Sequence, residues 1–368
     1  MHIGIDISQI IYQGTGVARF TYHLTKSILA ARTPHRFTFF FSSLKHNLHA
    51  DILSEIKKTD HTLVRWYVPP RMLSLMWNEA KWRNTMPVPH EFDLFISSDW
   101  TQPPVKIAQK QATIVHDLVF RKMPETVDPL ILSTQSKRLS HVVKECAQIW
   151  CDSASTKADL QSEYQDIFAK VSVNYPGISR LSVPTSARFN YAFKPGEYLF
   201  AVGKVEPRKN LKILIEAFLH LIQDPRFAHL SLVIAGPRGW DVDTSAFQHP
   251  KILMLGAVSD EDLATLYTHA LAFVFPSLYE GFGIPPLEAM TLGCPVIMSN
   301  SSSLTEIADE RSALYFDPRN MDELVAAMRF MALQPQARQS FIDNGYANVK
   351  RFTHEAYLAN MLESIEEL

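Results

Sequence analysis

The sequence predicts an α/β fold made of two doubly wound units, each a parallel sheet covered by helices. Short apolar runs alternate with amphipathic segments along the whole chain, and Gly, Pro, Asp or Ser residues separate them. These runs are too numerous for one ordinary sheet. The chain has 368 residues, of which 46% are hydrophobic, so it is long enough to form two cores.

The expected strands follow one another through the chain, and each is an apolar run that ends at turn-forming residues. In the first half they span 2–7, 37–42, 62–68, 92–98, 112–117, 148–153 and 171–177. In the second half they span 198–203, 231–236, 252–256, 272–277, 295–300 and 313–318. Between them lie segments with the apolar spacing of helices, such as 210–223 and 260–270. This alternation is typical of βαβ units.

The junction between the two units is expected at 179–197, which contains Pro and Ser and has no periodicity. It separates a first unit over 1–178 from a second over 190–352. In open α/β sheets, ligands bind beyond the carboxyl ends of the strands. Two such units facing each other would join their crevices in one cleft, and the candidate residues below all lie at predicted strand ends.

The segment 274–293, VFPSLYEGFGIPPLEAMTLG, carries the most specific functional pattern. An apolar strand ends in a loop with Glu280 and two glycines. Pro285 then predicts a helix start, because proline is tolerated in the first turn, and this register puts Glu288 in that turn. A helix start attracts phosphate, and carboxylates accept hydrogen bonds from hydroxyl groups. The pattern indicates a nucleotide-sugar site; helix electrostatics alone would explain Glu288 but not Glu280.

A second pattern, VGKVEPRKN at 202–210, places Lys204, Arg208 and Lys209 after a strand and at the start of a helix. Cations there would neutralise a diphosphate and stabilise it as a leaving group. The alternative is an exposed turn with solvated charges. Because cations at a helix N-terminus oppose the helix dipole, a ligand role explains their position better.

Two patterns in the first half suggest further ligand contacts. The segment YQGTGVARF has Gly14 and Gly16 between a strand and a helix, where the backbone would approach a diphosphate; a plain turn is the alternative. His116 lies at the end of the strand 112–117, beside Asp117. We expect it to contact the acceptor or the sugar, although an isolated His-Asp dipeptide is more often structural.

Composition excludes several classes of protein. The formal net charge is −2 and no dense basic cluster is present, so we expect no nucleic-acid partner. The three cysteines lack metal-ligand spacing and are too few for a disulfide framework, which favours a reducing cytoplasm. The N-terminus reads as a strand rather than a signal peptide, and no apolar run is long enough to span a membrane. We therefore expect a cytoplasmic protein.

Two segments need separate comment. The stretch 66–87 combines Trp66, Trp77 and Trp82 with cations and apolar residues, which suits a membrane interface or an acceptor pocket, and equally a helix packed on its own domain. Asp241-Val242-Asp243 has the form of a DxD metal motif, but no partner ligands accompany it and we expect no metal there. No Gly-x-Ser-x-Gly element is present that would predict a serine nucleophile.

Taken together, EGFGIPPLEAM, VGKVEPRKN, VHDL, and PSLYEGFG followed by GCPVIMSNSSSLTEI resemble glycosyltransferase family 4. Members of this family are retaining enzymes with the GT-B fold. The resemblance covers nearly the whole chain, is most specific over 198–330, and is looser in the first domain. Within the family, VHDL and EPRKNL look most like the GDP-mannose-dependent mannosyltransferases of polysaccharide and O-antigen assembly. The resemblance implies two Rossmann-like domains facing across a cleft, with a C-terminal helix, 353–368, that returns to the first domain.

The resemblance also implies a role for each candidate residue. Glu280 would hold hydroxyl groups of the transferred sugar, and Glu288 would hold the ribose. Lys209 and Lys204 would bind the diphosphate; Lys204 stands where the family commonly has Arg, which leaves its division of work with Arg208 open. Further donor or acceptor contacts are implied for Gly203, Val258, Gly281, Phe282, Gly283 and His116, beside the contacts already expected for Gly14 and Gly16.

We therefore expect a retaining glycosyltransferase that moves a hexose, with GDP-mannose as the expected donor, to a glycan or lipid-linked glycan. The departing diphosphate would take the acceptor proton, and no cofactor or metal is expected because Lys and Arg supply the positive charge. Three alternatives stay open: a UDP-sugar donor, a GT-B nucleotide-sugar epimerase, and an inactive GT-B scaffold subunit. Peripheral contact with the inner face of the plasma membrane is also left open.

Overall fold

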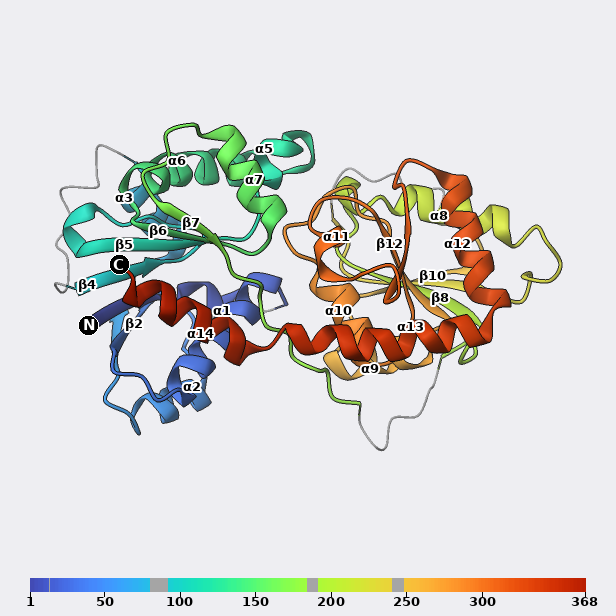
Figure 1. Cartoon of the computed structure of the whole chain (residues 1–368), viewed down its shortest axis with the longest axis horizontal. Coiled ribbons are helices and arrows are strands. Elements are labelled where there is room, and N and C mark those ends of the chain that lie inside the picture. Colours follow the sequence, from blue (N-terminus) through green and yellow to red (C-terminus); the bar gives the residue numbers. More distant parts are fainter. Residues whose placement is uncertain (13, 80–91, 184–190, 240–247) are drawn as a thin grey trace. The chain divides into compact units, whose positions relative to one another are not determined.

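The computed structural model of the chain divides into two compact units (Figure 1), which we describe one at a time. It describes residues 1–12, 14–79, 92–183, 191–239 and 248–368. The first unit comprises Met1–Gly177 and Thr353–Leu368, and the second comprises Ile178–Phe352. The C-terminal segment therefore belongs to the first unit and not to the one that precedes it in sequence.

The first unit is built on a seven-stranded parallel sheet with the order β3-β2-β1-β4-β5-β6-β7. Its strands are β1 (His2–Asp6), β2 (Arg36–Ser42), β3 (Thr62–Trp66), β4 (Phe92–Ser97), β5 (Ala108–Val115), β6 (Gln148–Cys151) and β7 (Lys170–Val173). Its α-helices are α1 (Gly16–Ala30), α2 (Ala50–Ile56), α3 (Pro70–Asn78), α5 (Val119–Lys122), α6 (Pro129–Glu145), α7 (Ala154–Glu163) and α14 (His354–Glu366). The described residues of this unit also contain the 3-10 turns η1 (Ser8–Ile11), η2 (Val105–Ile107) and η3 (Pro124–Thr126).

The second unit has a six-stranded parallel sheet with the order β10-β9-β8-β11-β12-β13. Its strands are β8 (Tyr198–Val202), β9 (Ser231–Ala235), β10 (Ile252–Gly256), β11 (Ala272–Phe275), β12 (Val296–Ser299) and β13 (Ala313–Phe316). Its α-helices are α8 (Leu211–Leu221), α9 (Asp260–His269), α10 (Ile284–Thr291), α11 (Leu304–Ile307), α12 (Met321–Leu333) and α13 (Pro335–Asn348). Two 3-10 turns are η4 (Pro207–Lys209) and η6 (Val349–Arg351).

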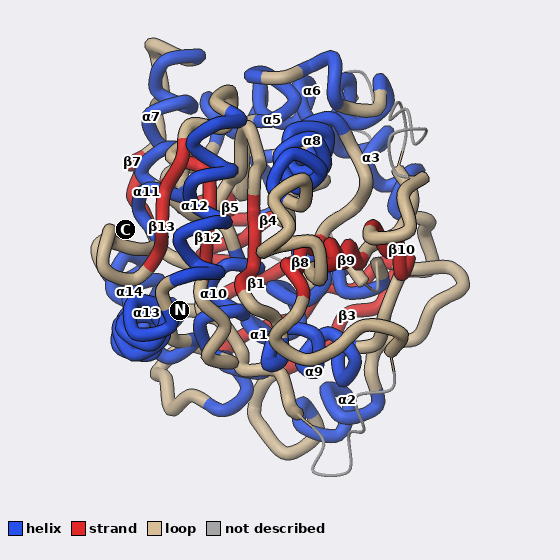
Figure 2. Tube along the Cα trace, turned by 90° about the vertical axis from the view of Figure 1, so that its right-hand side faces the viewer, coloured by secondary structure: helices blue, strands red, loops and turns tan. Residues whose placement is uncertain are grey.

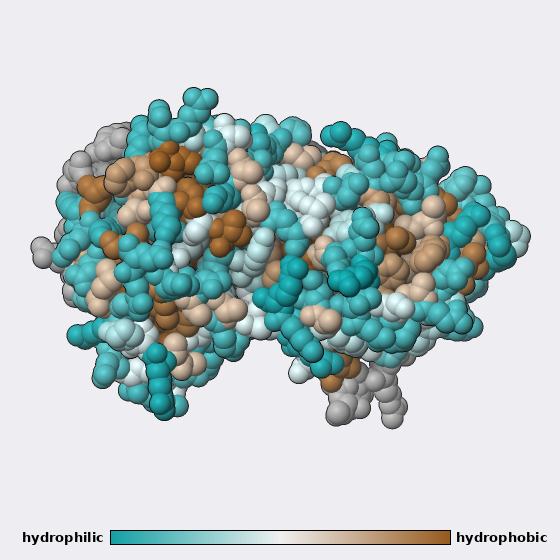
Figure 3. Space-filling view, viewed as in Figure 1, coloured by the Kyte–Doolittle hydropathy of each residue, from teal (hydrophilic) through white to brown (hydrophobic). Residues whose placement is uncertain are grey.

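Every segment predicted as a strand contains one, and the sheets are parallel as the strand–helix alternation predicted. In Figure 2 the red strands are flanked by blue helices. The central strands are buried along most of their length, as expected for sheets covered on both faces. On the face drawn in Figure 3 the hydrophobic residues are scattered among hydrophilic ones in both units, so the large apolar clusters are internal.

Helix α14 completes the core of the first unit. Tyr357, Leu358 and Met361 join the same buried cluster as β1, β2 and α1. The side-chain amide of Asn174 also donates a hydrogen bond to the Tyr357 carbonyl at 3.0 Å. A helix from the far end of the chain thus covers a surface that the first 177 residues leave apolar.

The six strands of the second sheet follow the same order as the first six strands of the first sheet, and that order places the ligand crevice. Chain progression runs outward from β1 to β3 and then resumes on the other side with β4; β8 and β11 are related in the same way. At such a switch point the loops after the two central strands diverge to opposite faces and leave a crevice at their carboxyl ends. The relevant loops therefore follow β1 and β4 in one unit and β8 and β11 in the other.

Part of the stretch 66–87 packs against its own unit, and another part is exposed. Trp66 and Trp77 pack against Phe40 and other aromatic rings in a buried cluster, so these two tryptophans belong to the core of their own unit. On the same helix Met72 and Leu75 are more than half exposed, whereas Trp82 lies outside the described residues. No helix in the described part of the chain is long and apolar enough to cross a bilayer.

Candidate functional site

In the second unit, the loops after β8 and β11 are joined into one structure. The Leu278 amide donates to the Arg208 carbonyl at 2.9 Å. The Asn210 side-chain amide donates to the carbonyls of Pro276 and Pro318, at 3.1 and 2.8 Å. Asn210 has a positive φ of 55°, which asparagine tolerates better than most residues. These contacts fix the turn that carries Arg208 and Lys209 against the loop that carries Glu280.

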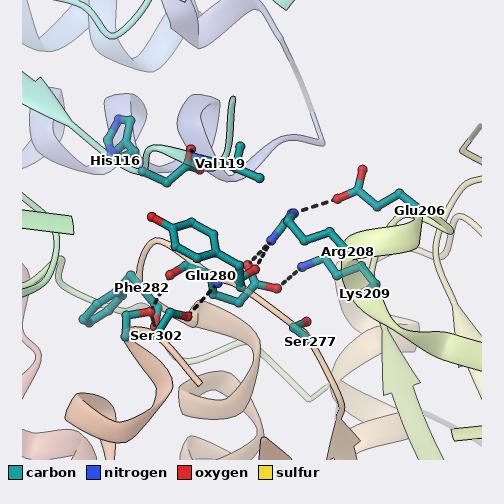
Figure 4. A network of polar contacts seen from close by, with 12 residues as sticks. His116, Val119, Glu206, Arg208, Lys209, Ser277, Glu280, Phe282 and Ser302 are labelled. Atoms are coloured by element: carbon teal, nitrogen blue, oxygen red, sulfur yellow. Dashed lines mark hydrogen bonds and ion pairs between the residues drawn. The ribbon is translucent and has the colours of Figure 1, made fainter. Parts of the chain in front are cut away.

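Arg208, Lys209 and Glu280 form a compact ion cluster (Figure 4). Lys209 Nζ lies 2.6 Å from Glu280 Oε1, and Arg208 Nη1 lies 2.7 Å from Glu280 Oε2. The other end of the guanidinium, Nη2, lies 2.7 Å from Glu206 Oε1. All four side chains are 11–16% exposed. The tertiary structure thus brings the two strongest sequence patterns together within hydrogen-bond distance.

The cluster keeps Glu280 ionised and balances its own charge. Burial would raise the pKa of Glu280, but the Arg208 and Lys209 cations lower it to about 2. Burial lowers the pKa of Lys209, and the Glu280 carboxylate opposes this shift. Two carboxylates face two cations, so the four charges sum to zero. An incoming diphosphate would therefore have to compete with Glu280 for its cations.

Serine hydroxyl groups hold the backbone on either side of the Glu280 side chain. Ser302 Oγ accepts a hydrogen bond from the Glu280 amide at 2.9 Å. Ser303 Oγ lies within donating distance of the Glu280 and Phe282 carbonyls, at 2.9 and 2.8 Å. The Phe282 ring packs edge-on against Phe352, with centroids 5.5 Å apart. The loop 280–283 is therefore fixed before any ligand arrives.

Gly283 caps α10 in a conformation that a side chain would obstruct. Its φ is +119°, and a Cβ there would come 2.7 Å from Leu304 Cδ2 and 2.8 Å from Ile307 Cδ1. Only glycine accommodates both constraints. The tight turn from the loop into the helix depends on this residue.

The register predicted for Glu288 is wrong. Helix α10 begins at Ile284, so Glu288 is its fifth residue, and the first turn holds no acid. Pro285 and Pro286 occupy that turn and contribute no N–H groups to an anion site. Glu288 is buried, at 5% exposure. Its burial, rather than the helix dipole, is what now marks it as unusual.

The cations lie directly before a helix start, as predicted, but not inside the α-helix. Arg208 and Lys209 lie on the 3-10 turn η4, and α8 begins only at Leu211. Carboxylates compensate them, so no conflict with a helix dipole arises. Gly203 has a φ of +144°, and a Cβ there would stand 3.3 Å from Lys209 Cε; the glycine leaves room for the lysine chain. Lys204 instead runs alongside Gly239, with Cγ 3.4 Å from the position of a Cβ there.

The remaining candidates of the second unit lie at the same edge of the sheet. Val258 is half-buried between the end of β10 and the start of α9, two strands away from β8. Gly281 is half-buried in the loop after β11. The structure therefore gathers the donor-side candidates at one carboxyl edge, while the role of each remains a prediction.

In the first unit, the partner of His116 is a residue that the sequence patterns missed. His116 directly follows β5, and its Nδ1 lies 2.6 Å from Oδ2 of Asp152, which follows the neighbouring strand β6. The adjacent Asp117 instead accepts from the Val119 amide at 2.9 Å and caps a turn. Burial alone would lower the pKa of His116, but the Asp152 carboxylate raises it to about 9. The ring is therefore held as an imidazolium by an ion pair.

Gly14 lies between η1 and α1 in the first unit, and Gly16 is the first residue of α1. Gly14 has a φ of +81°, and a Cβ at either position would meet no atom within 4 Å. Thr15 caps α1, since its Oγ1 accepts from the Ala18 amide at 3.2 Å. The loop is open to a ligand, and its predicted contact with a diphosphate remains a prediction.

Several residues important to this geometry gave little signal in the sequence. Asp152, Glu206, Ser302 and Ser303 are ordinary polar residues whose partners lie on other strands or loops. Asn210, at the start of a helical pattern, is the N-cap of α8 and adopts a left-handed conformation. In the described part of the chain, no group of three or more His, Cys, Asp or Glu side chains is placed to hold a metal ion. Asp241 and Asp243 lie outside that part.

Comparison with known proteins assigns the second unit to a family. Residues 185–348 match the family described as "Glycosyl transferases group 1", so the second unit carries a glycosyltransferase domain of that group. The resemblance drawn from its motifs is thereby confirmed for this domain.

Two relatives that the chain resembles are named as mannosyltransferases. "O-antigen chain mannosyltransferase B" of Escherichia coli is 37% identical over 164 residues, which cover 43% of this chain and 42% of that protein. "O-antigen chain mannosyltransferase RfbU" of Salmonella typhimurium is 26% identical over 66% of each chain. The first match thus spans less than half the length of that relative.

The fold of the whole chain matches solved glycosyltransferase structures. A sucrose-phosphate synthase from Thermosynechococcus elongatus superposes with a TM-score of 0.72 at 17% identity, covering 100% of this chain and 98% of the other. The predicted GT-B fold with two Rossmann-like units is confirmed.

Proposed function

We propose that the protein is a retaining glycosyltransferase that moves mannose from GDP-mannose to a glycan or lipid-linked glycan. The observation that carries this proposal is the ion cluster of Arg208, Lys209 and Glu280 at the switch point of a glycosyl transferases group 1 domain. It combines cations suited to a diphosphate with a carboxylate suited to sugar hydroxyl groups. Mannose is favoured because the relatives are named as mannosyltransferases.

The contacts of this cluster suggest an order of events at the donor. The diphosphate displaces the Glu280 carboxylate from Lys209, and Glu280 is then available to accept hydrogen bonds from the sugar. Arg208 keeps its second contact with Glu206 and its hydrogen bond to the Tyr279 carbonyl, at 2.7 Å. The loop therefore stays in place while the charges exchange partners. Cations close to the leaving diphosphate stabilise the charge that develops on it.

Transfer with retention then needs no protein base. The departing diphosphate oxygen takes the acceptor proton, and the new bond forms on the face that the leaving group vacates. Catalysis rests on positioning and on leaving-group electrostatics. Glu288 holds the ribose in this scheme, and His116 contributes a fixed imidazolium on the acceptor side.

The direct test uses the purified full chain with a panel of nucleotides and nucleotide sugars. Thermal shifts with GDP, UDP, GDP-mannose, UDP-glucose and UDP-N-acetylglucosamine identify the donor, because a ligand that binds the folded state raises its melting temperature. Transfer from the preferred donor to methyl α-mannoside is followed by NMR, which also reports the configuration of the product. An α-mannoside formed from the α-linked donor is the expected result.

Each alternative predicts a different outcome. A preference for UDP-sugars would change the proposed donor but leave the proposed reaction, sugar transfer, unchanged. Conversion of the free nucleotide sugar without an acceptor would indicate an epimerase. Donor binding without any reaction, unchanged in Lys209→Met, would indicate a scaffold subunit.

We also propose a peripheral membrane contact through the exposed face of α3. Tyr67, Met72 and Leu75 are 55–65% exposed, and Arg65 lies over the Tyr67 ring with its guanidinium carbon 4.6 Å from the centroid. Apolar and basic side chains together suit an anionic lipid surface. In a flotation assay with phosphatidylglycerol vesicles, a smaller fraction of the double variant Met72→Asn, Leu75→Asn should bind to the vesicles. The control Phe168→Asn, also at an exposed residue of this unit, should not, and no difference between the variants would contradict the proposal.

A further inference from the structure

A cavity of about 180 Å³ lies at the amino edge of the sheet in the second unit. Gly196, Leu230 and Leu271 line it, and they come one or two residues before β8, β9 and β11. The ion cluster around Glu280 belongs to the loops at the opposite ends of β8 and β11. Strands of four or five residues rise about 3.3 Å per residue, so roughly 15 Å of strand separates the two places.

The walls of this cavity combine apolar side chains with cationic ones. The apolar walls are Phe227, Leu230, Leu271, Ala332 and Leu333. The polar side chains that line it are those of Arg226, His229 and Arg338. Among the described residues, no Asp or Glu lines the cavity. A site with this composition favours an anion that also carries carbon atoms.

Arg338 is a half-buried cation in this wall, on the first turn of α13. Its Nη1 donates to the Met331 carbonyl at 3.1 Å. Burial is the cause that lowers the pKa of Arg338, and no carboxylate among the described residues opposes it. Withdrawing a charge from water without a counter-charge costs free energy. An anion bound in the cavity would offset this cost.

The Phe227 ring holds two more arginines beside the cavity. The guanidinium carbons of Arg226 and Arg329 lie 5.4 and 5.7 Å from its centroid. Arg226 donates to Asp224 through Nε and Nη2, at 2.6–3.1 Å, which leaves Nη1 able to donate elsewhere. Arg226 and, to a smaller extent, Arg329 lower the pKa of Asp224 to about 2. With Arg338, three arginines thus face one carboxylate, an excess of two positive charges.

A phosphate ester matches this excess better than a carboxylate does. A phosphate monoester carries about two negative charges at pH 7 and offers three acceptor oxygens, whereas a carboxylate carries one charge. Guanidinium groups bind phosphate oxygens in a forked geometry. The cavity is several times larger than the space that one water molecule needs, so a phosphate group and its first carbon atoms fit. The apolar walls suit those carbon atoms.

We propose that this cavity binds the phosphate group of a phosphorylated carbon compound. Arg226 and Arg338 hold the phosphate oxygens, and Phe227 and Leu333 contact the esterified carbon chain. The site is separate from the proposed donor site and does not depend on sugar transfer. The same chemistry is available from a soluble phosphate ester and from a phospholipid headgroup, which the experiment distinguishes.

Calorimetry on the full chain tests the proposal, with excess GDP present to keep the probes from the donor-side cations. The soluble probe is sn-glycerol 3-phosphate, and butyrate is the carboxylate of similar size. We expect sn-glycerol 3-phosphate to bind and butyrate to bind at least about tenfold more weakly, because it has half the charge. A tighter binding of butyrate would overturn the assignment to phosphate.

A flotation assay tests the lipid source, with phosphatidylcholine vesicles that do or do not contain phosphatidic acid. Binding to phosphatidic acid that is lost in Arg338→Gln, without binding of the soluble ester, would support the site and identify its ligand as a headgroup. Binding of the soluble ester identifies a free metabolite. A protein that binds neither probe would overturn the proposal.

Variants then assign the effect to the cavity. Arg226→Gln and Arg338→Gln should each weaken binding of the phosphate about tenfold, and Ala332→Leu should do the same by filling the space without changing the charge. The matched control is Arg311→Gln, because Arg311 contacts Asp309 through the same Nε and Nη2 atoms but does not line the cavity; it should have no effect. Melting temperature and GDP affinity should stay at the wild-type level in all four variants. An unchanged affinity in both arginine variants or in Ala332→Leu, or an equal loss in Arg311→Gln, would overturn the proposal.

Discussion

The substitution Glu280→Gln has two opposite consequences that can be worked out from the ion cluster. It keeps the shape of the side chain but removes the charge that two buried cations share. The pKa of Glu280 is about 2 in the folded chain against an ordinary 4.5, which corresponds to roughly 3 kcal/mol at 1.36 kcal/mol per unit of pKa. Breaking a buried pair typically costs a similar 3–5 kcal/mol. We therefore expect the second unit to lose about 3 kcal/mol of stability at pH 7.

The pH dependence has a definite sign. Because the pKa of Glu280 is depressed on folding, its contribution is fully present above pH 4.5 and is lost as the pH falls through about 2. The stability difference between the wild type and Glu280→Gln should therefore shrink as the pH falls below 4.5.

Urea titration with pulsed hydrogen exchange measures this difference in stability. Peptides from β8, β11 and α10 report on the second unit directly. Glu216→Gln on α8 is the control. Its partner Lys212 is 3.9 Å away and both side chains are largely exposed, so we expect a change below about 0.5 kcal/mol.

The same substitution should strengthen the binding of free GDP. Without Glu280, Arg208 and Lys209 no longer have to leave a carboxylate before they meet a diphosphate. Two unit charges 4 Å apart interact by about 4 kcal/mol near a protein surface, so a tenfold gain in affinity, about 1.4 kcal/mol, is a conservative expectation. Calorimetry with GDP measures it, and mannosyl transfer should fall at the same time. A variant that is as stable as the wild type and binds GDP no more tightly would refute the reasoning about the cluster.

Further predictions concern single contacts. Lys209→Met removes a cation from the proposed diphosphate site, so GDP affinity should fall at least tenfold by calorimetry; an unchanged affinity contradicts that role. Asp152→Asn removes the carboxylate that raises the pKa of His116, so an NMR titration should give a value below the ordinary 6.5, since burial lowers it. Because the pKa of His116 is raised on folding, the ion pair stabilises the wild type fully below pH 6.5 and loses this effect as the pH rises through about 9; urea midpoints of the two proteins should converge at high pH. Gly283→Ala combines a φ of +119° with a 2.7 Å approach to a leucine side chain and should cost at least about 2 kcal/mol. Gly16→Ala, which meets open space, should change stability by less than about 1 kcal/mol.

Much of the fold could be predicted from the sequence because local patterns determine it. Every predicted strand is present, since apolar runs ended by Gly, Pro, Asp or Ser leave a buried parallel strand as the natural outcome. The motif around Glu280 and the cationic turn were found for the same reason, because a strand end, a glycine loop and a proline-led helix are local features. Element ends were less secure: the prolines alone could not show that Gly283 caps the helix and that α10 starts at Ile284.

The sequence by itself thus determined the two Rossmann-like units, the edge of each sheet that carries the site, and the donor-side motif. Only the tertiary structure decided the partners: Asp152 for His116, Glu206 for Arg208, and the pairing of Glu280 with Lys209. The physical reason is that propensity and periodicity act over a few neighbouring residues, whereas an ion pair or a cavity depends on side chains from different strands meeting in space.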